Sequence, residues 1–116
     1  MNAVSSQTFP KYLRLQNTLD FKRIFAHGYR ENLEFIKIIS LENSFEFPRL
    51  GIVAGKKDLP KAFLRTKFKR VLREIFRKNK HNLSSKDYIA ISTKKIKDVG
   101  SSYSGKDFER FIEGIH

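Results

Sequence analysis

The segment Lys56–Lys80 carries most of the excess charge of this chain. It reads KKDLPKAFLRTKFKRVLREIFRKNK and holds eleven Lys or Arg and two acids, which is nine of the twelve net positive charges of the 116 residues. Guanidinium groups grip phosphates bidentately, and ammonium groups bind them as point charges. A basic excess this concentrated predicts a polyanion partner, with nucleic acid first and an anionic membrane second.

Apolar residues recur through the same segment at helical spacing. The pattern predicts an α-helix from Ala62 to Asn79, with Pro60 in the turn before it. At ~100° per residue, one arc of roughly 100° holds the apolar side chains Leu64, Phe68, Val71, Leu72 and Ile75. The opposite side carries Thr66, Lys69, Arg70, Arg73 and Arg77. We therefore expect one face in a core and one basic face toward phosphates; charges of almost one sign disfavour a merely solvated face.

A shorter helix is expected over residues 17–28. Asn17 can cap its N-terminus, and Gly28 ends it as a C′ residue. Phe21 and Phe25 fall on one side with Ile24, a spacing more typical of core packing than of a binding surface.

The remaining segments predict three strands and a final helix. Strands are expected over 33–43, 49–55 and 87–93, with a turn at 43–48 after the first. Gly51 indicates close backbone approach or a bulge. A helix over 106–115 is expected, with Ser104 as its cap. The order α, β, β, α, β, α is typical of an α+β domain.

Length and composition fit a single domain. Residues 1–12 predict a flexible N-terminus, and residues 13–116 a single domain, which the basic segment marks as nucleic-acid-binding. The chain has no Cys, which excludes disulfides and thiolate metal sites. It shows neither the apolar run of a signal peptide nor a membrane span, and we expect a cytoplasmic location.

Residues that could perform acid–base or nucleophilic catalysis are few and scattered. His27, His81 and His116 share no spacing with carboxylates, and no phosphate-loop or nucleophile-elbow motif occurs. Turn or cap roles explain the isolated acids Asp20, Asp58, Asp87, Asp98 and Asp107. An active site in the protein itself is therefore disfavoured, and we predict neither a catalytic residue nor a protein-held metal.

Residues 49–57 (RLGIVAGKK) and 62–77 (AFLRTKFKRVLREIFR) resemble the signature region of the bacterial ribonuclease P protein component. That pattern reads roughly R-x-G-(apolar)-x-x-S-K-K, a short turn, then A-V-x-R-N-x-x-K-R-x-(apolar)-R-E-x-F-R. Residues 19–28 and 87–92 resemble its first helix and its later strand. Three departures stand out: Thr66 replaces the family Asn, Gly55 replaces Ser, and the turn at 58–61 is one residue longer.

The resemblance implies a two-layer α/β sandwich with a small mixed sheet and a left-handed βαβ crossover. It also implies the protein subunit of an RNA-based endoribonuclease that frees the 5′ leader from precursor tRNA. Catalysis and Mg²⁺ would belong to the RNA subunit, with no cofactor held tightly by the protein. The implied partners are ribonuclease P RNA and the precursor tRNA leader, with no membrane and one protein copy in the holoenzyme.

The family motif, carried over by position, implies two sets of contact residues. The RNA-binding set is Lys56, Lys57, Arg65, Thr66, Lys67, Lys69, Arg70, Arg73 and Arg77. The leader-binding cleft would use Phe21, Phe25 and Ile38, where Ile38 stands at a position that relatives often fill with an aromatic. With the resemblance, core packing and a cleft role for the two Phe residues become equal alternatives.

Other classes of function would share parts of this pattern. A ribosomal or ribosome-associated RNA-binding protein would have the same charge and α+β build. A protein-only nuclease conflicts with the sparse His and acid pattern. A DNA-binding helix-turn-helix regulator would need a helix directly before the basic one, where this chain predicts a strand.

Overall fold

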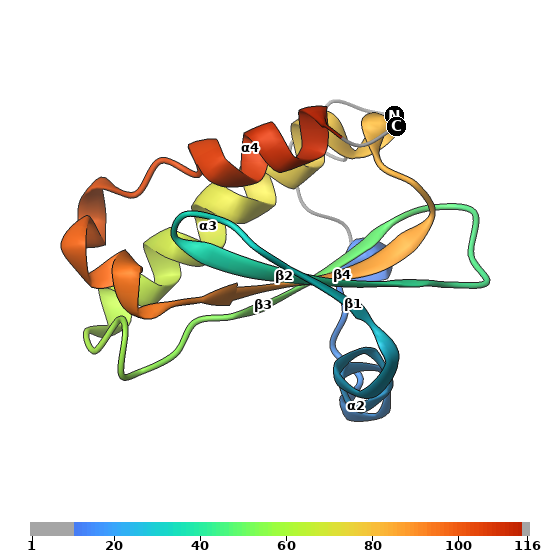
Figure 1. Cartoon of the computed structure of the whole chain (residues 1–116), viewed down its shortest axis with the longest axis horizontal. Helices are drawn as coiled ribbons and strands as arrows, with labels where there is room; N and C mark the ends of the chain where they lie inside the picture. The colour runs from blue at the N-terminus through green and yellow to red at the C-terminus, as the bar shows by residue number, and fades with distance from the viewer. Residues whose placement is uncertain (1–10, 115–116) are drawn as a thin grey trace.

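The computed structural model describes residues 11–114, in which helices cover both faces of a four-stranded sheet (Figure 1). The α-helices are α2 (Thr18–His27), α3 (Ala62–Asn79) and α4 (Lys106–Glu113). The strands are β1 (Tyr29–Asn32), β2 (Ile36–Glu42), β3 (Arg49–Val53) and β4 (Lys86–Ser92). The short 3₁₀ helices are η1 (Lys11–Leu13), η2 (Lys80–Asn82), η3 (Lys94–Asp98) and η4 (Gly100–Ser102).

The sheet is mixed, in the order β1-β2-β4-β3. Strands β1 and β4 pair antiparallel with β2, while β3 pairs parallel with β4. The predicted α+β class with a small mixed sheet is therefore confirmed. Because β4 lies between β2 and β3, the turn at 43–48 joins two strands that are not neighbours. Helix α3 provides the crossover from β3 to β4, and the left-handed sense of that crossover remains a prediction.

Strand β1 is an element that the sequence pattern did not predict. All four of its residues are exposed, and Tyr-Arg-Glu-Asn lacks the alternation of a half-buried strand. It forms the edge of the sheet by pairing with β2, for example Arg30 opposite Ile39. The strand therefore forms because its backbone pairs with β2, and its own side chains show no pattern from which it could be predicted.

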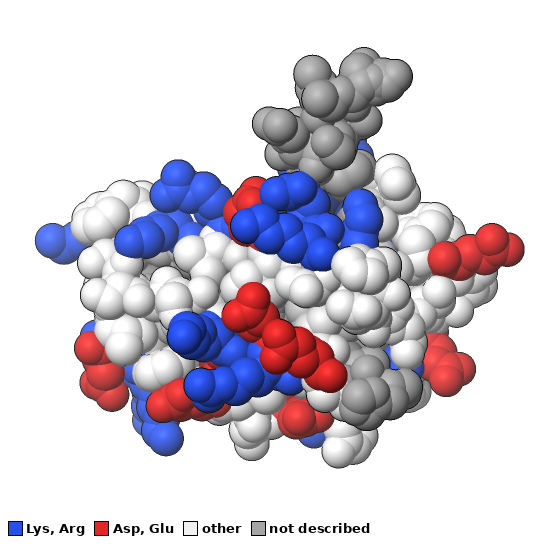
Figure 2. Space-filling model, turned by 90° about the horizontal axis from the view of Figure 1, so that it is seen from above, with Lys and Arg blue, Asp and Glu red and all other residues white. Residues whose placement is uncertain are grey.

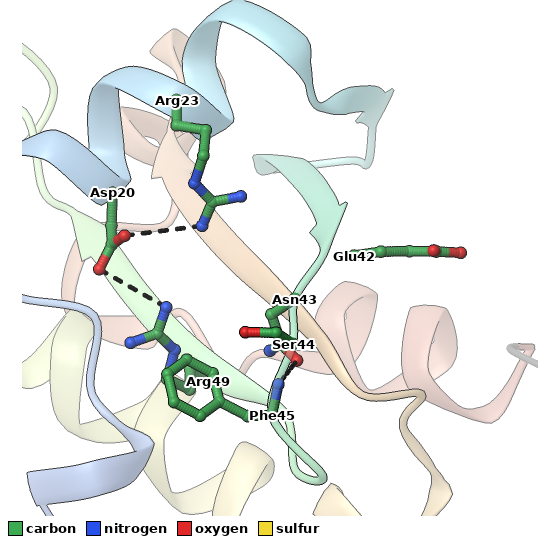
Figure 3. A pocket seen from close by; sticks show the side chains of 7 residues that line it. All are labelled: Asp20, Arg23, Glu42, Asn43, Ser44, Phe45 and Arg49. Carbon is green, nitrogen blue, oxygen red and sulfur yellow. Dashed lines mark hydrogen bonds and ion pairs between the residues drawn. The ribbon is translucent and has the colours of Figure 1, made fainter.

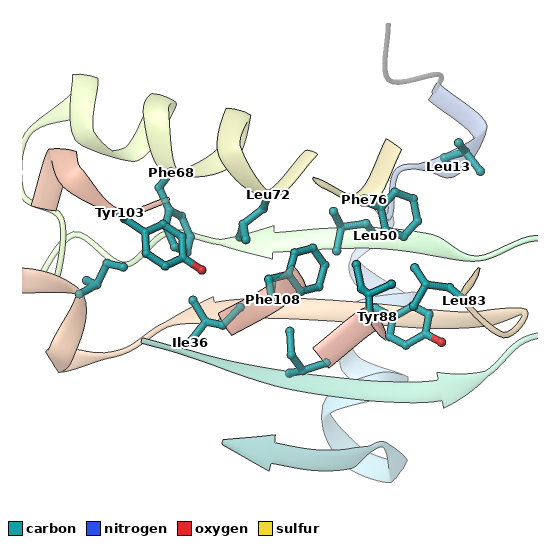
Figure 4. Packing of buried hydrophobic residues seen from close by; sticks show 14 of the residues in the cluster. Leu13, Ile36, Leu50, Phe68, Leu72, Phe76, Leu83, Tyr88, Tyr103 and Phe108 are labelled. Carbon is teal, nitrogen blue, oxygen red and sulfur yellow. The ribbon is translucent and has the colours of Figure 1, made fainter. Parts of the chain in front are cut away.

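The larger core lies between the sheet and helices α3 and α4. Figure 4 shows Phe68, Leu72 and Phe76 of α3 directed at the sheet, where Tyr88 and Phe108 are also buried. Half-buried side chains complete the expected apolar face of α3: Leu64, Val71 and Ile75. The periodicity of α3 thus matches its packing, and its bounds are those predicted.

Helix α2 packs on the opposite face of the sheet over a smaller cluster of Leu15, Ile24, Ile39 and Ile89. The Asn17 side chain caps the helix, accepting a hydrogen bond of 2.8 Å from the backbone of Leu19. Gly28 follows α2 but is not a left-handed C′ residue, because its φ is −75°. A Cβ there would lie 2.5 Å from Ile39 Cγ2, so the position requires glycine for packing.

Helix α4 is capped differently from the prediction. Its N-cap is Gly105, with φ of 78°, and not Ser104. A Cβ on Gly105 would lie 2.3 Å from Ile75 Cδ1, so glycine also lets α4 approach α3. At the other end of the chain, Lys11 and Tyr12 belong to η1, while the rest of the expected flexible N-terminus lies outside the described residues.

Candidate nucleic-acid interface

The basic face of α3 (Thr66, Lys69, Arg70, Arg73 and Arg77) lies on the side away from the core. Thr66 and Arg70 are exposed, and the other three are half-buried. Figure 2 shows Lys and Arg side chains gathered in a band over α3, whereas α4 beside it mixes both signs of charge. The arrangement predicted from the sequence is thus present as a surface.

Three cations of this face have no acidic partner in the part of the chain that the structure describes. Among residues 11–114, no carboxylate lies within ion-pairing distance of Lys69, Arg70 or Arg73. Arg77 differs, because its guanidinium pairs with Glu74 at 2.9 Å. Like charges left uncompensated in this way repel one another until a polyanion binds.

Arg14 adds a further positive charge next to this face, from the segment that lies beside β3. Burial, together with the charge of Arg14, lowers the pKa of Arg73 from its usual value. The Arg73 guanidinium stays protonated in spite of this shift, since its ordinary pKa lies far above neutrality. Arg14 was not predicted as a site residue, because it is distant in sequence from the basic segment.

Two cations of the predicted RNA-binding set also have structural roles. The Arg65 guanidinium donates to the backbone carbonyls of Leu59 and Pro60, at 2.8 and 2.9 Å, and so fixes the turn before α3. The Lys67 ammonium donates to the carbonyl of Ser101 and thereby ties α3 to η4. Part of the hydrogen-bonding capacity of both side chains is therefore used inside the protein.

Lys56 and Lys57 are exposed at the end of β3, in the turn that leads to α3. The turn is anchored to the end of β4, because the backbone N–H of Gly55 donates to Ser92 Oγ at 2.9 Å. That hydroxyl in turn donates to Asp58 at 3.2 Å. The two lysines therefore extend from a fixed turn that precedes the N-terminal end of α3.

The two aromatic residues of α2 separate into a packed ring and an exposed one. Phe21 is half-buried against the smaller cluster, and a Cβ on Gly51 would lie 2.6 Å from its Cζ. Phe25 keeps 37% of its surface exposed, and the two ring centroids lie 6.4 Å apart. The close approach expected at Gly51 is thus confirmed, and Phe25 is the ring available to a ligand.

Ile38 does not belong to the predicted leader cleft. It is only 1% exposed and packs in the larger core, under α3 and α4. Side chains of a strand alternate between faces, so Ile39, and not Ile38, points toward α2. The prediction for Ile38 is wrong because it placed this residue on the wrong face of β2.

A buried ion network joins α2 to the sheet, and sequence reasoning missed it. Asp87 is fully buried and accepts hydrogen bonds from Arg49 (2.8 Å, twice), Arg23 (2.9 Å) and Asn43 (2.9 Å). Burial raises the pKa of Asp87, but Arg49, Asn43 and Arg23 together lower it below its usual value. The turn or cap role predicted for Asp87 was therefore wrong. Its position at the start of an apolar predicted strand could have indicated a buried ion pair, because a buried charge needs a partner.

This network borders a pocket of about 550 Å³ (Figure 3). Asp20 lies between Arg23 and Arg49, at 3.6 and 3.5 Å, and the Arg49 guanidinium lies 4.4 Å from the centre of the Phe45 ring. Both guanidinium groups are thus engaged by carboxylates, in contrast to Lys69, Arg70 and Arg73. The ion pairs that border this pocket hold α2 against the sheet, and they leave Arg23 and Arg49 less available to a ligand than unpaired cations would be.

The described residues contain no group of three or more His, Asp or Glu side chains placed to hold a metal ion. Within the same residues, no helix is both long and apolar enough to cross a membrane. His27 ends α2 and His81 lies in η2, and both are exposed.

The protein family described as Ribonuclease P matches this chain over residues 9–116. The ribonuclease P protein component of Aliivibrio salmonicida (strain LFI1238) is 35% identical over 107 residues, covering 92% of this chain and 88% of the relative. The RNase P protein of Staphylococcus aureus superposes with a TM-score of 0.79 at 30% identity, covering 89% of this chain and 96% of that one. The Thermotoga maritima RNase P protein gives the same TM-score and identity, with 89% and 97% covered. This chain belongs to the ribonuclease P protein family.

Proposed function

We propose that this chain, as the protein component of ribonuclease P, binds the catalytic RNA through the basic face of α3 and the precursor tRNA leader along α2. The proposal rests on one observation: some of the cations are paired with acids of the protein, and those on the basic face of α3 are not. Within residues 11–114, the protein pairs Arg23 and Arg49 with its own acids but leaves Lys69, Arg70 and Arg73 without acidic partners. A folded RNA supplies the missing anions.

Electrostatics would provide most of the affinity for the RNA. Residues one helical turn apart are separated by about 5–6 Å, close to the spacing of phosphates along one strand. Each phosphate neutralised releases counterions, so binding becomes steeply salt-dependent. The protein would thereby screen repulsion between the catalytic RNA and its tRNA substrate.

The leader would lie on the α2 side of the sheet. Phe25 offers an exposed ring there, while Phe21 forms the packed wall beside Gly51. Half-buried Lys37, Val53 and Ile91 continue this face beyond the smaller cluster. Aromatic and cationic groups on a shallow surface suit single-stranded nucleotides without strict sequence reading.

The hydrolysis itself would take place in the RNA subunit, which would also hold Mg²⁺, with one protein copy in each holoenzyme. The dispersed, exposed His27 and His81 support this division, because acid–base catalysis requires groups that converge on one reacting atom. The role of the protein is then positional and electrostatic.

Reconstitution with the cognate ribonuclease P RNA and a precursor tRNA tests the proposal. The chain should stimulate 5′ cleavage at low Mg²⁺, and the protein without RNA should not cleave. Arg70→Ala with Arg73→Ala should weaken binding to the RNA and reduce the slope of log affinity against log salt by about two. The matched control is Lys106→Ala with Arg110→Ala on the mixed-charge surface of α4, which removes the same charge.

Two outcomes would contradict the proposal. If the Arg70 and Arg73 double variant binds the RNA like the α4 control at physiological salt, the basic face of α3 is not the interface. If the protein binds RNA without stimulating cleavage, the ribosome-associated alternative is favoured.

A further inference from the structure

A groove at the N-terminal end of α3 lies next to the basic face but is not part of it. Figure 1 shows the turn before α3 and the η3–η4 segment at the same end of the molecule. Between them lies a cavity of about 410 Å³, whose apolar lining comes from Leu59, Pro60 and Leu64. Two lysines from different segments, Lys57 and Lys97, line it as well.

The groove is held open by contacts within the protein. On one side, Arg65 fixes the carbonyls of Leu59 and Pro60, and Leu59 is itself buried. On the other side, the Lys67 ammonium holds the carbonyl of Ser101, next to Gly100 in the groove wall. A binding surface fixed in this way loses little conformational entropy when a ligand enters.

An exposed aromatic side chain directly precedes Leu64 of the groove lining in the chain. Phe63 precedes Leu64 in the first turn of α3 and keeps 61% of its surface exposed. It lies one helical turn before Lys67, on the side of α3 that faces η4. Phe63 does not belong to the larger core of the described residues, which uses Phe68, Leu72 and Phe76 of α3 instead.

The charges around the groove favour a negatively charged ligand. Lys57 and Lys97 line it, and Lys61 is exposed in the same turn. The one acid in the lining, Asp58, already accepts a hydrogen bond from Ser92. An apolar floor, an exposed ring and separate cations fit a nucleotide, whose base needs stacking and whose phosphate needs positive charge.

We propose that this groove captures an unpaired nucleotide of the partner RNA, with its base against Phe63 and its phosphate between Lys57 and Lys97. The inference rests on the proposed function, which supplies the RNA. It adds a contact for a single extruded base to the phosphate contacts of the α3 face.

The test uses the full chain carrying Phe25→Ala as the parent protein of every variant, so that the proposed leader site on α2 contributes little, and a fluorescently labelled single-stranded oligoadenylate of about eight nucleotides. Phe63→Ala should weaken its binding by about five- to a hundredfold, the range expected when one stacked base loses its aromatic partner. Phe63→Tyr keeps the ring and should bind like the parent protein. Tyr12→Ala is the matched control, because Tyr12 is 60% exposed but lies near η2, past the other end of α3. Lys97→Ala should reduce the salt slope by about one.

The outcomes separate this inference from the proposed function. If Phe63→Ala binds the oligonucleotide like Tyr12→Ala, the groove does not hold a base, whatever the Arg70 and Arg73 variants do. If the parent protein binds an acidic peptide through Phe63 but no oligonucleotide, the occupant is a protein and the inference is overturned. Ultraviolet crosslinks from the oligonucleotide should map to residues 59–64 or 97–100, and crosslinks found only elsewhere would also overturn it.

Discussion

Asp87 is a single residue that joins helix α2 to the sheet. It is the second residue of the inner strand β4 and holds Arg23 of α2 and Arg49 of β3 on one carboxylate. Hydrogen bonding to Asp87 raises the pKa of Arg49, whose side chain is only 13% exposed. A buried charge cluster therefore fixes helix α2 against the face of the sheet that it covers.

Removing that carboxylate charge should destabilise the fold strongly. Asp87→Asn removes the fully buried carboxylate and leaves Arg49 only its longer, 3.5 Å contact with Asp20, and we expect a loss of about 3 kcal/mol in the free energy of unfolding. Urea denaturation at neutral pH measures it. Asp98→Asn, at an exposed site in η3, is the control and should stay within about 0.5 kcal/mol of the parent protein. Equal effects of the two substitutions would show that the network adds no stability.

The same residue predicts a dependence of stability on acid. The pKa of Asp87 is lower in the folded than in the unfolded chain, where it is about 3.9. Its stabilising contribution is therefore complete above pH 3.9 or so and is lost as the pH falls through the folded-state pKa. The difference in unfolding free energy between the parent protein and Asp87→Asn should shrink as the pH falls below about 4. A difference that stays constant down to pH 2 would contradict this assignment.

At the scale of elements, the strength of the local pattern decided what could be predicted. Helix α3 was located with its observed bounds because a core stripe and a basic face repeat through five turns of 3.6 residues. Strand β1 has no such pattern, and the position of β4 between β2 and β3 depends on long-range pairing. Ile38 was misplaced because a shift of one residue along a strand moves a side chain to the other face.

The candidate interface was predictable to a similar degree. Uncompensated charge on α3 can be seen in sequence, since almost no acids interrupt it. The backbone contacts of Arg65 and Lys67 could not be foreseen, because their acceptors belong to the preceding turn and to η4. Arg14 approaches Arg73 only through the bridge between its segment and β3.

The two Phe residues of helix α2 should differ in their effects on leader binding and on stability. Phe25→Ala should weaken binding of a single-stranded leader by about 1–3 kcal/mol, because an exposed stacking surface is lost while the fold keeps its core. Phe21→Ala should lower both leader affinity and the free energy of unfolding, since its ring packs over Gly51. Fluorescence anisotropy with a leader oligonucleotide and thermal melts of each variant provide the two measurements. Similar effects of both variants on stability would contradict the separation of a packed ring from an exposed one.

At the scale of the whole molecule, the sheet separates two kinds of surface. Helices α3 and α4 bury the larger core, and α3 then turns its basic face outward (Figures 2 and 4). Helix α2 covers only part of the opposite face and leaves the exposed ring of Phe25 there. Under the proposed function, one small domain would contact a folded RNA on one side and a single strand on the other.

The net charge of +12 predicts opposite salt responses of the free protein and of its RNA complex. In the free protein, added salt screens repulsion among the unpaired cations, while the buried pairs of Asp87 are screened much less. The free energy of unfolding should therefore rise between about 0.05 and 0.5 M KCl. Binding to the cognate RNA should weaken steeply over the same range, because salt opposes counterion release. Arg70→Ala with Arg73→Ala should flatten both responses, since the same charges cause both. If the double variant flattened only the binding response, these two arginines would not be a source of repulsion in the free protein.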